Sequence, residues 1–402
     1  MEAIILNTEF EFIAVVDVYK SFIWAERFDE AGDFEIYIPI TDAPPYFIQK
    51  NYYVLTKKSK TLMTIDTISI ESAEEGGAFY TVSGKCIKNL LSRRIVWNKT
   101  IFATEENEVD NGDGTTRMEY VEQNLQNGVE KLLNENVIGL PDDNKFIAAR
   151  RIPNFIFERS DDERITKLTF EAEYLGEDLY SVISTLCKEN EIGFELTYHE
   201  TYTKDGQDYT NAFVFKLVAG TDRSYEQTEN PYVVFAPKYD NIFKTNYIDS
   251  DASFKNVTLV VGESDLDEDG NEISRVQHVE YTNNEMRSGL DRREVFTDAT
   301  SLSTDDGYGG TLSPARYAAQ LRQKGIDTLM ECTTITAFEG EVDPSQMYEY
   351  GIDYNIGDIV QIANEYGHEG RAYISEFVMS CDESGISAYP TFKIIEKGVY
   401  EK

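Results

Sequence analysis

Short runs of β-branched and aromatic residues, separated by turn-forming residues, follow one another from Ile4 to Val82 and constrain the fold more than any other feature. Such runs predict consecutive β-strands, because these side chains favour an extended backbone. Gly32 is expected to form a tight turn, and Pro39 and the Pro44–Pro45 pair exclude a helix there. The spacing favours a small barrel or sandwich. The expected strands are Ile13–Val16, Phe22–Phe28, Asp33–Ile38, Tyr52–Leu55, Leu62–Ile65 and Phe79–Val82.

Helical and strand patterns alternate in the next part of the chain, residues 102–220, after a first β domain over residues 1–101. A short helix is expected just after Gly84. A longer helix is predicted by an apolar stripe that includes Leu125 and Leu132, and another by a stripe that Asp178 caps. The Asp-Gly pair in Lys204–Gln207 predicts a hairpin between two strands. This mixture predicts an α+β domain.

Strand patterns return after residue 220 and predict a second β domain formed by residues 221–261 and 330–402. Residues 262–329 are set into it as a charged hairpin followed by a helix. That helix is expected to open at Ser313 with Pro314 at its first position, and Gly325 in its apolar stripe allows a close backbone approach. The expected strands are Tyr232–Phe235, Phe243–Ile248, Asn256–Val261, Met330–Ala337, Ile359–Ala363, Ala372–Met379 and Thr391–Ile395.

The charge balance excludes several classes of protein. The 402 residues include 73 Asp and Glu against 37 Lys and Arg, a formal net charge of -36. Such a surface repels phosphate backbones, which excludes a typical nucleic-acid binder. The N-terminus has no signal-peptide pattern and the chain has no expected membrane span. Four scattered cysteines are interpreted as reduced core residues: Cys86, Cys187, Cys332 and Cys381.

One stretch, Ser288–Ala299, combines charged and apolar residues in an unusual pattern. Within it Arg292 and Arg293 stand between Asp291 and Glu294. In so acidic a chain, carboxylates are expected to hold both guanidinium groups, whose planar shape suits bidentate pairing. The stretch is either a solvated turn with weak surface ion pairs or a structural link. As a link it would fix the inserted segment against the second β domain or a neighbouring subunit through buried pairs.

Motifs for catalysis or metal binding are missing or incomplete. Residues 265–270 open like a calcium loop, but Val276 occupies the twelfth position, where such a loop needs Glu, so a hairpin tip is preferred. Asp110–Asp113 is interpreted in the same way. The three histidines lie in no metalloprotease pattern, and Gly307–Gly310 lacks the Lys-Ser or Lys-Thr of a phosphate loop. No catalytic, cofactor-binding or metal-binding residue is therefore predicted.

Four segments, spread in order along most of the chain, resemble a known family when they are taken together. They are Ser21–Ile36, with Trp24, Arg27 and Gly32; Gly84 with Leu90–Ile95, which contains Arg93 and Arg94; the arginine stretch; and Asp353–Val360, with Gly357 and Asp358. In these segments the chain resembles the ReqiPepy-type siphovirus tail proteins, which are similar to the baseplate hub proteins of phage tails.

This resemblance implies a structural role in the virion, at the tip of a phage tail. It implies a homotrimer that closes the distal end of the tail tube. This trimer joins a distal tail or tube protein above to a central fibre or spike below, with the tape-measure protein as a further candidate partner. DNA passes through such a hub without being bound, and no membrane is involved. The sequence ends at Lys402, so the hydrolase or fibre domain fused to some tail-tip proteins is not expected.

The expected fold class is therefore β-rich α+β, with two tube-like β-barrel domains, an intervening α+β domain and an inserted hairpin-helix segment. Two alternatives stay open: a carboxylate-dependent cell-wall hydrolase of the tail tip, and a carbohydrate-binding module. The hub interpretation makes three further predictions. The channel is lined by acids, the two arginines act structurally, and three chains place six similar β domains in one ring.

Overall fold

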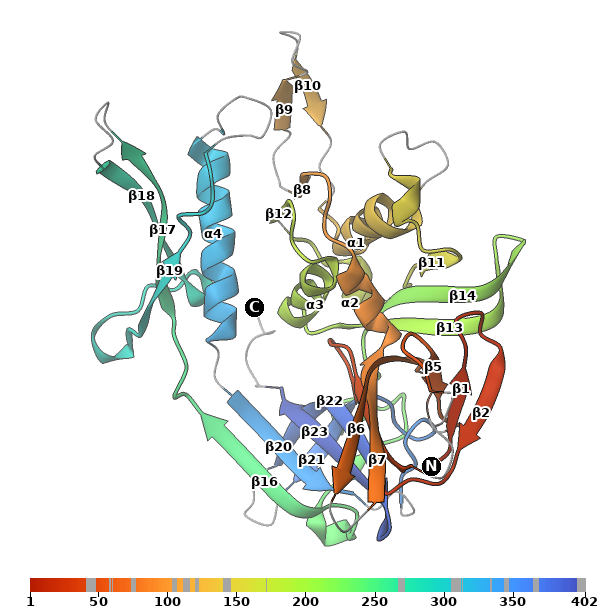
Figure 1. Ribbon diagram of the computed structural model, residues 1–402. Coiled ribbons are helices and arrows are strands. Elements are labelled where there is room, and N and C mark those ends of the chain that lie inside the picture. Colours follow the sequence, from red (N-terminus) through yellow and green to blue (C-terminus); the bar gives the residue numbers. More distant parts are fainter. Residues whose placement is uncertain are drawn as a thin grey trace.

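The computed structural model shows one large sheet at the base, a helical domain above it, and a smaller sheet with a long helix beside that domain (Figure 1). Within the described part of the chain, no helix is long and apolar enough to span a membrane. The structure describes residues 1–40, 48–57, 59, 61–73, 77–102, 107–110, 116–119, 123–139, 146–170, 172–266, 272–304, 312, 314–332, 335–342, 347–363 and 369–395.

The large sheet contains strands from both predicted strand sections. The first section supplies β1 (Ala3–Leu6), β2 (Phe12–Val16), β3 (Ser21–Arg27), β4 (Asp33–Pro39), β5 (Tyr53–Leu55), β6 (Met63–Ala73) and β7 (Gly77–Cys86). The second supplies β15 (Val234–Phe235), β16 (Phe243–Ser250), β20 (Ile335–Glu341), β21 (Ile359–Ala363), β22 (Glu369–Asp382) and β23 (Gly385–Ile394), with the short helix η4 (Pro237–Tyr239) after β15. All six strands predicted between Ile13 and Val82 are confirmed.

The two sections are joined by one pair of strands, β3 and β22. They run antiparallel, with Arg27 opposite Glu376 and Ser21 opposite Asp382. The pairing path through the described strands is β16-β20-β23-β22-β3-β4-β7-β6-β5-β1-β2, and β21 joins β15 to β22. This continuous path differs from the expected pair of separate barrels. Among the described strands neither section closes on itself, because β3 and β22 use their edges to pair with each other.

The two strand sections also share one hydrophobic core. Its largest side chains come from both sections and are almost fully buried: Phe22, Trp24, Phe34, Phe235, Phe338, Phe377 and Phe392. Burying one such aromatic side chain contributes about 1.5–3 kcal/mol. The contact between the sections is therefore held by packed side chains as well as by backbone hydrogen bonds, and the two sections form one structural unit.

The helical domain has its own core. Because η1 packs into it, this domain begins near Ile87, and the predicted boundary at residue 101 falls inside β8. Its three-stranded sheet has the order β11-β14-β13. Its elements are η1 (Ile87–Arg93), β8 (Thr100–Phe102), β9 (Asn107–Asp110), β10 (Thr116–Glu119), α1 (Leu125–Leu133), η2 (Asn134–Ile138), η3 (Ala148–Arg150), β11 (Phe155–Glu158), α2 (Glu163–Thr166), β12 (Ala172–Tyr174), α3 (Leu179–Glu189), β13 (Gly193–Lys204) and β14 (Gln207–Val218).

Local signals in this domain are confirmed. The Asp178 carboxylate accepts a hydrogen bond of 2.8 Å from the Ser181 N–H and so caps α3. The predicted hairpin joins β13 to β14, and Asp205 and Gly206 both have positive φ angles, as a type I′ turn requires.

The insert is a separate unit made of β17 (Val257–Leu266), β18 (Glu272–Tyr281), β19 (Glu294–Asp298) and α4 (Pro314–Glu331), with η5 (Thr282–Asn284) and η6 (Gly289–Asp291) between β18 and β19. The strand predicted at Asn256–Val261 is present as part of β17, but β17 pairs with β18 and β19 and, among the described strands, not with the large sheet. Met330 is in α4 and not in a strand. The close approach at Gly325 is confirmed, since a Cβ there would lie 2.9 Å from Val260.

Several predicted features lie outside the described residues. These are the hairpin tip at 267–271, the turn at 111–115, the Gly307–Gly310 loop, Ser313 and His368. The strands that flank the first two are described: β17 pairs with β18, and β9 pairs with β10, both antiparallel. All four cysteines are free thiols, and Cys86 and Cys187 are buried.

Candidate functional site: a junction of three motif segments

Three of the four motif segments meet where the two strand sections join the helical domain. Trp24 on β3 is fully buried, and its indole N–H donates to the Glu26 carboxylate at 3.1 Å. The second oxygen of Glu26 accepts from the Tyr350 hydroxyl at 2.8 Å. The Tyr350 ring in turn stacks on Phe377 of β22, with 3.8 Å between ring centroids. Trp24 is therefore part of a contact between the first and the second strand section.

Arg27 at the end of β3 links the same two sections by charge. Its guanidinium donates to Asp33 of β4 at 2.5 Å, to Glu376 of β22 at 2.7 Å and to the Ala31 carbonyl at 3.0 Å. Burial alone would lower the pKa of Arg27, but the hydrogen bonds and charges of Asp33 and Glu376 raise it. The group remains charged and holds β4 and β22 on either side of β3.

Gly32 lies in the connection between β3 and β4, but the physical reason for glycine differs from the prediction. Its φ is not in the left-handed region. A Cβ at this position would lie 2.1 Å from the Ala25 carbonyl oxygen, so the two backbone segments are too close for any side chain. Gly84 is in the same situation, 1.8 Å from the Thr64 carbonyl oxygen.

The Phe28 ring occupies the point where the three regions meet. A Cβ on Gly193 of β13 would lie 2.4 Å from this ring, and a Cβ on Gly357 would lie 2.1 Å from it. Gly357 also has a φ of +85°, a conformation that other residues adopt only with strain. The two glycines thus let the helical domain and the second section close on Phe28 from different sides.

Asp358, next to Gly357, forms the buried ion pair of the junction. Its carboxylate accepts from the Arg223 guanidinium at 2.8 Å and from the N–H groups of Thr221 and Asn355 at 2.8 and 3.0 Å. The Asp358 and Arg223 side chains are only 5% and 15% exposed. Removing one partner of such a pair leaves a buried charge without compensation, which typically costs about 3–5 kcal/mol.

Lys88 on η1 is a junction residue that the sequence analysis missed. Its ammonium group is buried and donates to three carbonyl oxygens of the β3–β4 connection, those of Arg27, Phe28 and Glu30, at 2.8, 3.0 and 3.1 Å. It also lies 4.7 Å from the centre of the Phe194 ring. Burial lowers the pKa of Lys88. One lysine inside an otherwise apolar helical stripe is the only sequence signal for this role.

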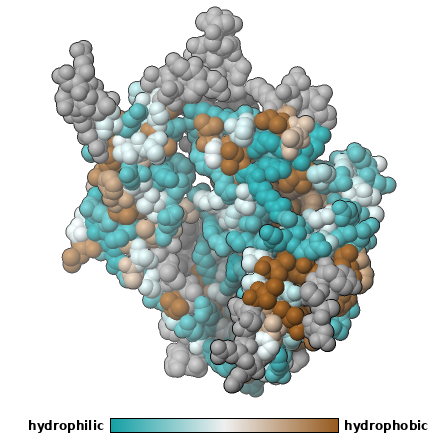
Figure 2. All heavy atoms as spheres, in the orientation of Figure 1, coloured by the Kyte–Doolittle hydropathy of each residue, from teal (hydrophilic) through white to brown (hydrophobic). Residues whose placement is uncertain are grey.

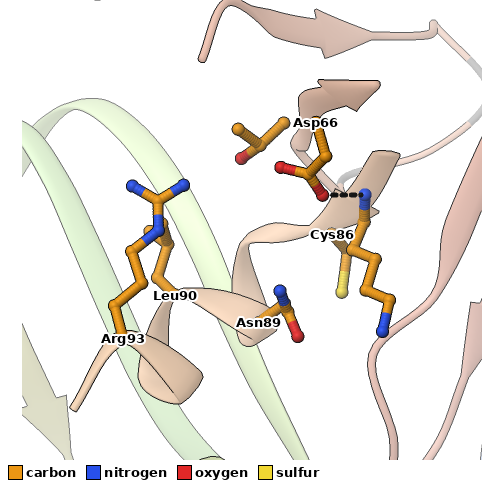
Figure 3. A pocket seen from close by; sticks show the side chains of 7 residues that line it. Asp66, Cys86, Asn89, Leu90 and Arg93 are labelled. Atoms are coloured by element: carbon orange, nitrogen blue, oxygen red, sulfur yellow. Dashed lines mark hydrogen bonds between the residues drawn. The ribbon is translucent and has the colours of Figure 1, made fainter. Parts of the chain in front are cut away.

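Arg93 and Arg94 end η1 but do not act together. The Arg94 guanidinium donates to the Arg150 carbonyl at 2.8 Å and so ties η1 to the rest of the helical domain. Arg93 is exposed and lines a cavity of about 10 Å³ together with Asp66 and Asn89, as Figure 3 shows. Burial raises the pKa of Asp66. A cavity of this size holds about one water molecule, which excludes a larger ligand.

The arginine stretch lies on the insert, away from the junction. Arg292 pairs with Glu294 at 2.5 Å, and Arg293 pairs with Asp251 at 2.5 Å. The carboxylates are 64% and 63% exposed, so both pairs are surface pairs within the described chain. Two hydrogen bonds of the buried Asn256 side chain form a third link to the arginine stretch. This side chain donates to the Asp291 carbonyl at 2.6 Å and accepts from the Arg293 N–H at 2.8 Å.

Within the described residues no group of three or more His, Cys, Asp or Glu side chains could hold a metal ion. A shallow hollow of about 400 Å³ lies beside α2 and β22, and two arginines line it. Both are already paired: Arg371 with Asp222 and Glu226, and Arg164 with Asp162. The polar groups of this hollow hold the surrounding loops together, so it offers few donors to a substrate.

The comparisons with known proteins agree with the motif segments. The model of the family described as siphovirus ReqiPepy6 Gp37-like protein matches residues 2–392. The chain belongs to this family. It is therefore a member of a siphovirus tail protein family. A search of curated proteins found no match.

Solved structures of prophage tail proteins resemble the chain along its whole length. One is the tail protein gp18 of Listeria monocytogenes EGD-e, with 14% sequence identity, a TM-score of 0.46 and coverage of 99% of this chain and 96% of that chain. Another is the 43 kDa tail protein of prophage MuSo2 from Shewanella oneidensis, with 12% identity, a TM-score of 0.48 and 98% coverage of both chains. A tail protein of Neisseria meningitidis MC58 has 10% identity, a TM-score of 0.48 and coverage of 99% and 97%.

Proposed function

We propose that three copies of this chain form the hub at the distal end of a phage tail or tail-like particle. The hub closes the tail tube and joins a distal tail or tube protein to a central fibre or spike. Family membership supports the tail location. The open sheet is the observation that supports a ring of several copies. Within the described strands, β2 pairs only with β1, and β16 pairs only with β20.

Both terminal strands carry exposed apolar side chains, and within the described strands each has one edge without a paired strand. Phe12 on β2 is 63% exposed, and Phe243 on β16 is 40% exposed. Edge strands of this kind pair with other chains unless something covers them. A ring in which β16 of one copy meets β2 of the next covers both edges of every copy, and cyclic closure is usual for homo-oligomers.

Three copies bring six strand sections into such a ring, two from each chain. This arrangement lets a three-fold assembly match a six-fold tube. The shared core fixes the two sections of each chain relative to each other, as a rigid adaptor needs. Sedimentation equilibrium is expected to give three times the chain mass of 45.9 kDa. A stable dimer or monomer would contradict the hub.

The proposal also fixes the charge of the channel and the place of the protein. A net charge of -36 per chain lets DNA slide past without counterion-releasing phosphate contacts, so the channel is lined mainly by Asp and Glu. Immunogold labelling of particles is expected at the tail tip. A basic channel in the assembled ring, or label along the tail shaft, would contradict these points.

The proposed hub is not an enzyme. The junction groups with shifted pKa values take part in packing: burial raises the pKa of Asp29 and lowers that of Lys88, which is held by three carbonyl oxygens. A zymogram on bacterial cell walls is expected to show no clearing by the purified chain. Clearing would favour the carboxylate-dependent hydrolase instead.

A further inference from the structure

The insert sheet has one covered face and one open face. α4 covers the side that carries Val260, which Gly325 of α4 approaches closely. On the opposite side Leu259 of the central strand β17 lies between Val279 of β18 and Phe296 of β19, its direct partners in the sheet register. These three side chains are 37%, 39% and 59% exposed. They form an apolar row across the sheet, which we call the insert face.

The arginine stretch borders this row. Tyr281 and Val257 are the next cross-strand pair along the sheet, two residues from Val279 and Leu259. The Arg292 guanidinium lies 5.8 Å from the centre of the Tyr281 ring. The connection between β18 and β19 adds Met286 and Leu290, both largely exposed. Exposed Phe, Met, Leu and Arg together are typical of protein interfaces and unusual on an isolated surface.

The segment beside the insert face carries no net charge, although the chain as a whole is strongly acidic. Residues 281–296 contain three arginines and three carboxylates, and are neutral in a chain of net charge -36. Like charges that face each other across an interface cost binding free energy, and a neutral, arginine-bearing surface avoids that cost. The charged residues of this range are Arg287, Arg292, Arg293, Glu285, Asp291 and Glu294.

A second apolar surface, in an acidic segment, lies on β2, at the end of the large sheet opposite to β16. On the side of β2 that faces away from the core, Phe12 lies opposite Leu6, and Val15 lies opposite Ile4. Phe12 and Val15 are exposed, as is Val18 beyond the strand; Figure 2 shows apolar surface gathered over β1, β2 and β5. We call this the β2 strip. The first 20 residues contain one lysine and four carboxylates, Glu2, Glu9, Glu11 and Asp17.

We propose that the insert face of one copy docks on the β2 strip of the next copy. This contact rests on the proposed ring and names the surfaces that hold it. The insert follows β16 directly in the chain and is therefore attached at the end of the large sheet opposite to β2 (Figure 1). Where β16 of one copy pairs with β2 of the next, the insert of the first copy lies close to the β2 strip of the second. Apolar rows then meet, and arginines face carboxylates.

Site-specific photo-cross-linking tests this contact. A benzophenone amino acid replaces Phe296, and the variant is assembled with isotope-labelled wild-type chain, so that mass spectrometry separates contacts within a copy from contacts between copies. The expected product joins position 296 to residues 1–20 of another copy. The matched control carries the same photo-probe at Leu175, which is 55% exposed on the helical domain, and gives no product with that segment.

A substitution tests how much the same contact contributes to the affinity between the copies. Phe296→Asp is expected to raise the dissociation constant of the trimer by at least about tenfold, with an unchanged circular dichroism spectrum, while Leu175→Asp leaves it unchanged. If the chain is a trimer but position 296 cross-links elsewhere and Phe296→Asp assembles normally, the contact is wrong and the hub stands. If the chain forms no trimer, the hub and this contact fail together.

Discussion

The junction and the insert each hold a motif residue in an arginine–aspartate pair, yet the two pairs differ in surroundings. Asp358 and Arg223 are almost completely buried, and two backbone N–H groups complete the shell of the carboxylate. Arg293 and Asp251 are 39% and 63% exposed. In the first pair the protein replaces water around the charge, whereas in the second water remains. A charged motif therefore has a structural role where its pair is buried, and acts at a surface where it is exposed.

The largest expected effect is the loss of the buried carboxylate. Asp358→Ala leaves the Arg223 charge and two N–H donors without an acceptor, and is expected to destabilise the large sheet by about 3–5 kcal/mol. Urea unfolding followed by Trp24 fluorescence measures this in a Trp97→Phe background, because the chain has only two tryptophans and Trp24 lies in that sheet. The matched change Asp251→Ala is expected to leave the midpoint unchanged. Equal effects of both changes would show that the buried pair and the exposed pair contribute alike to stability.

A substitution at Gly357 tests how tightly the junction is packed, without changing any charge. Gly357→Ala forces a left-handed φ of +85° on alanine and brings its Cβ to 2.1 Å from Phe28, which is expected to cost about 2–4 kcal/mol. Gly351 is the matched control, because its φ is +86° but no atom lies within 4 Å of an added Cβ. Gly351→Ala is expected to cost about 1–2 kcal/mol from backbone strain alone. The difference between the two variants isolates the contact with Phe28.

Glu189 at the end of α3 is a buried carboxylate without the partners that Asp358 has. Its Oε1 has no hydrogen-bond partner within the described chain. Burial, and then the charge of Asp327 on α4, raise the pKa of Glu189 to about 7 from 4.5. The folded chain therefore binds a proton that the unfolded chain has lost between pH 4.5 and 7, so stability falls as the pH rises through this window.

Glu189→Gln removes this penalty. The variant is expected to match the parent below pH 4.5 and to exceed its stability by on the order of 2 kcal/mol above pH 7, where the parent carboxylate is charged. Thermal melting across this range measures the difference. A gap between the two proteins that does not change with pH would show that Glu189 does not titrate in the folded state.

The smallest effect is expected from the exposed arginines. Arg292→Ala and Arg293→Ala remove surface ion pairs that water already screens, so the melting temperature is expected to stay the same. Lys167 at the end of α2, whose pair with Glu163 is 72% and 79% exposed, serves as the control substitution to Ala. Loss of the trimer without loss of thermal stability would place the arginines at a subunit contact. Loss of thermal stability would favour a structural link within the chain.

Local features of this fold could be predicted from the sequence because their causes lie within a few residues. The cap at Asp178, the turn at Asp205–Gly206 and the close approach at Gly325 each depend on one residue type at one position. The pairing of β3 with β22 has no such local signal, since it depends on contacts between strands far apart in the chain. The strand pattern predicted both sections but not that they share one sheet.

In the candidate site, too, some residues could be predicted from the sequence and others could not. The motif segments pointed to Arg27, Gly357 and Asp358, and the structure brings all three to the junction. Their partners could not be predicted: Arg223 lies in a polar loop without any pattern, and Lys88 is held by backbone carbonyl groups, which every sequence contains. Whether a charge is buried also depends on its distant neighbours, and this is why the sequence left both interpretations of Arg292 and Arg293 open.

The pairing of β3 with β22 has a consequence for synthesis. Arg27 and Glu376, which face each other across this pair, are 349 residues apart in sequence. Contacts between such distant residues form late and slow the folding of a chain. On the ribosome, β3 emerges long before its partner, with one edge uncovered and prone to aggregation. The helical domain has a core of its own and can fold during this interval, whereas the large sheet is completed only after β22 has been made. The proposed ring assembly through β2 and β16 is therefore expected to begin only after nearly the whole chain has been translated.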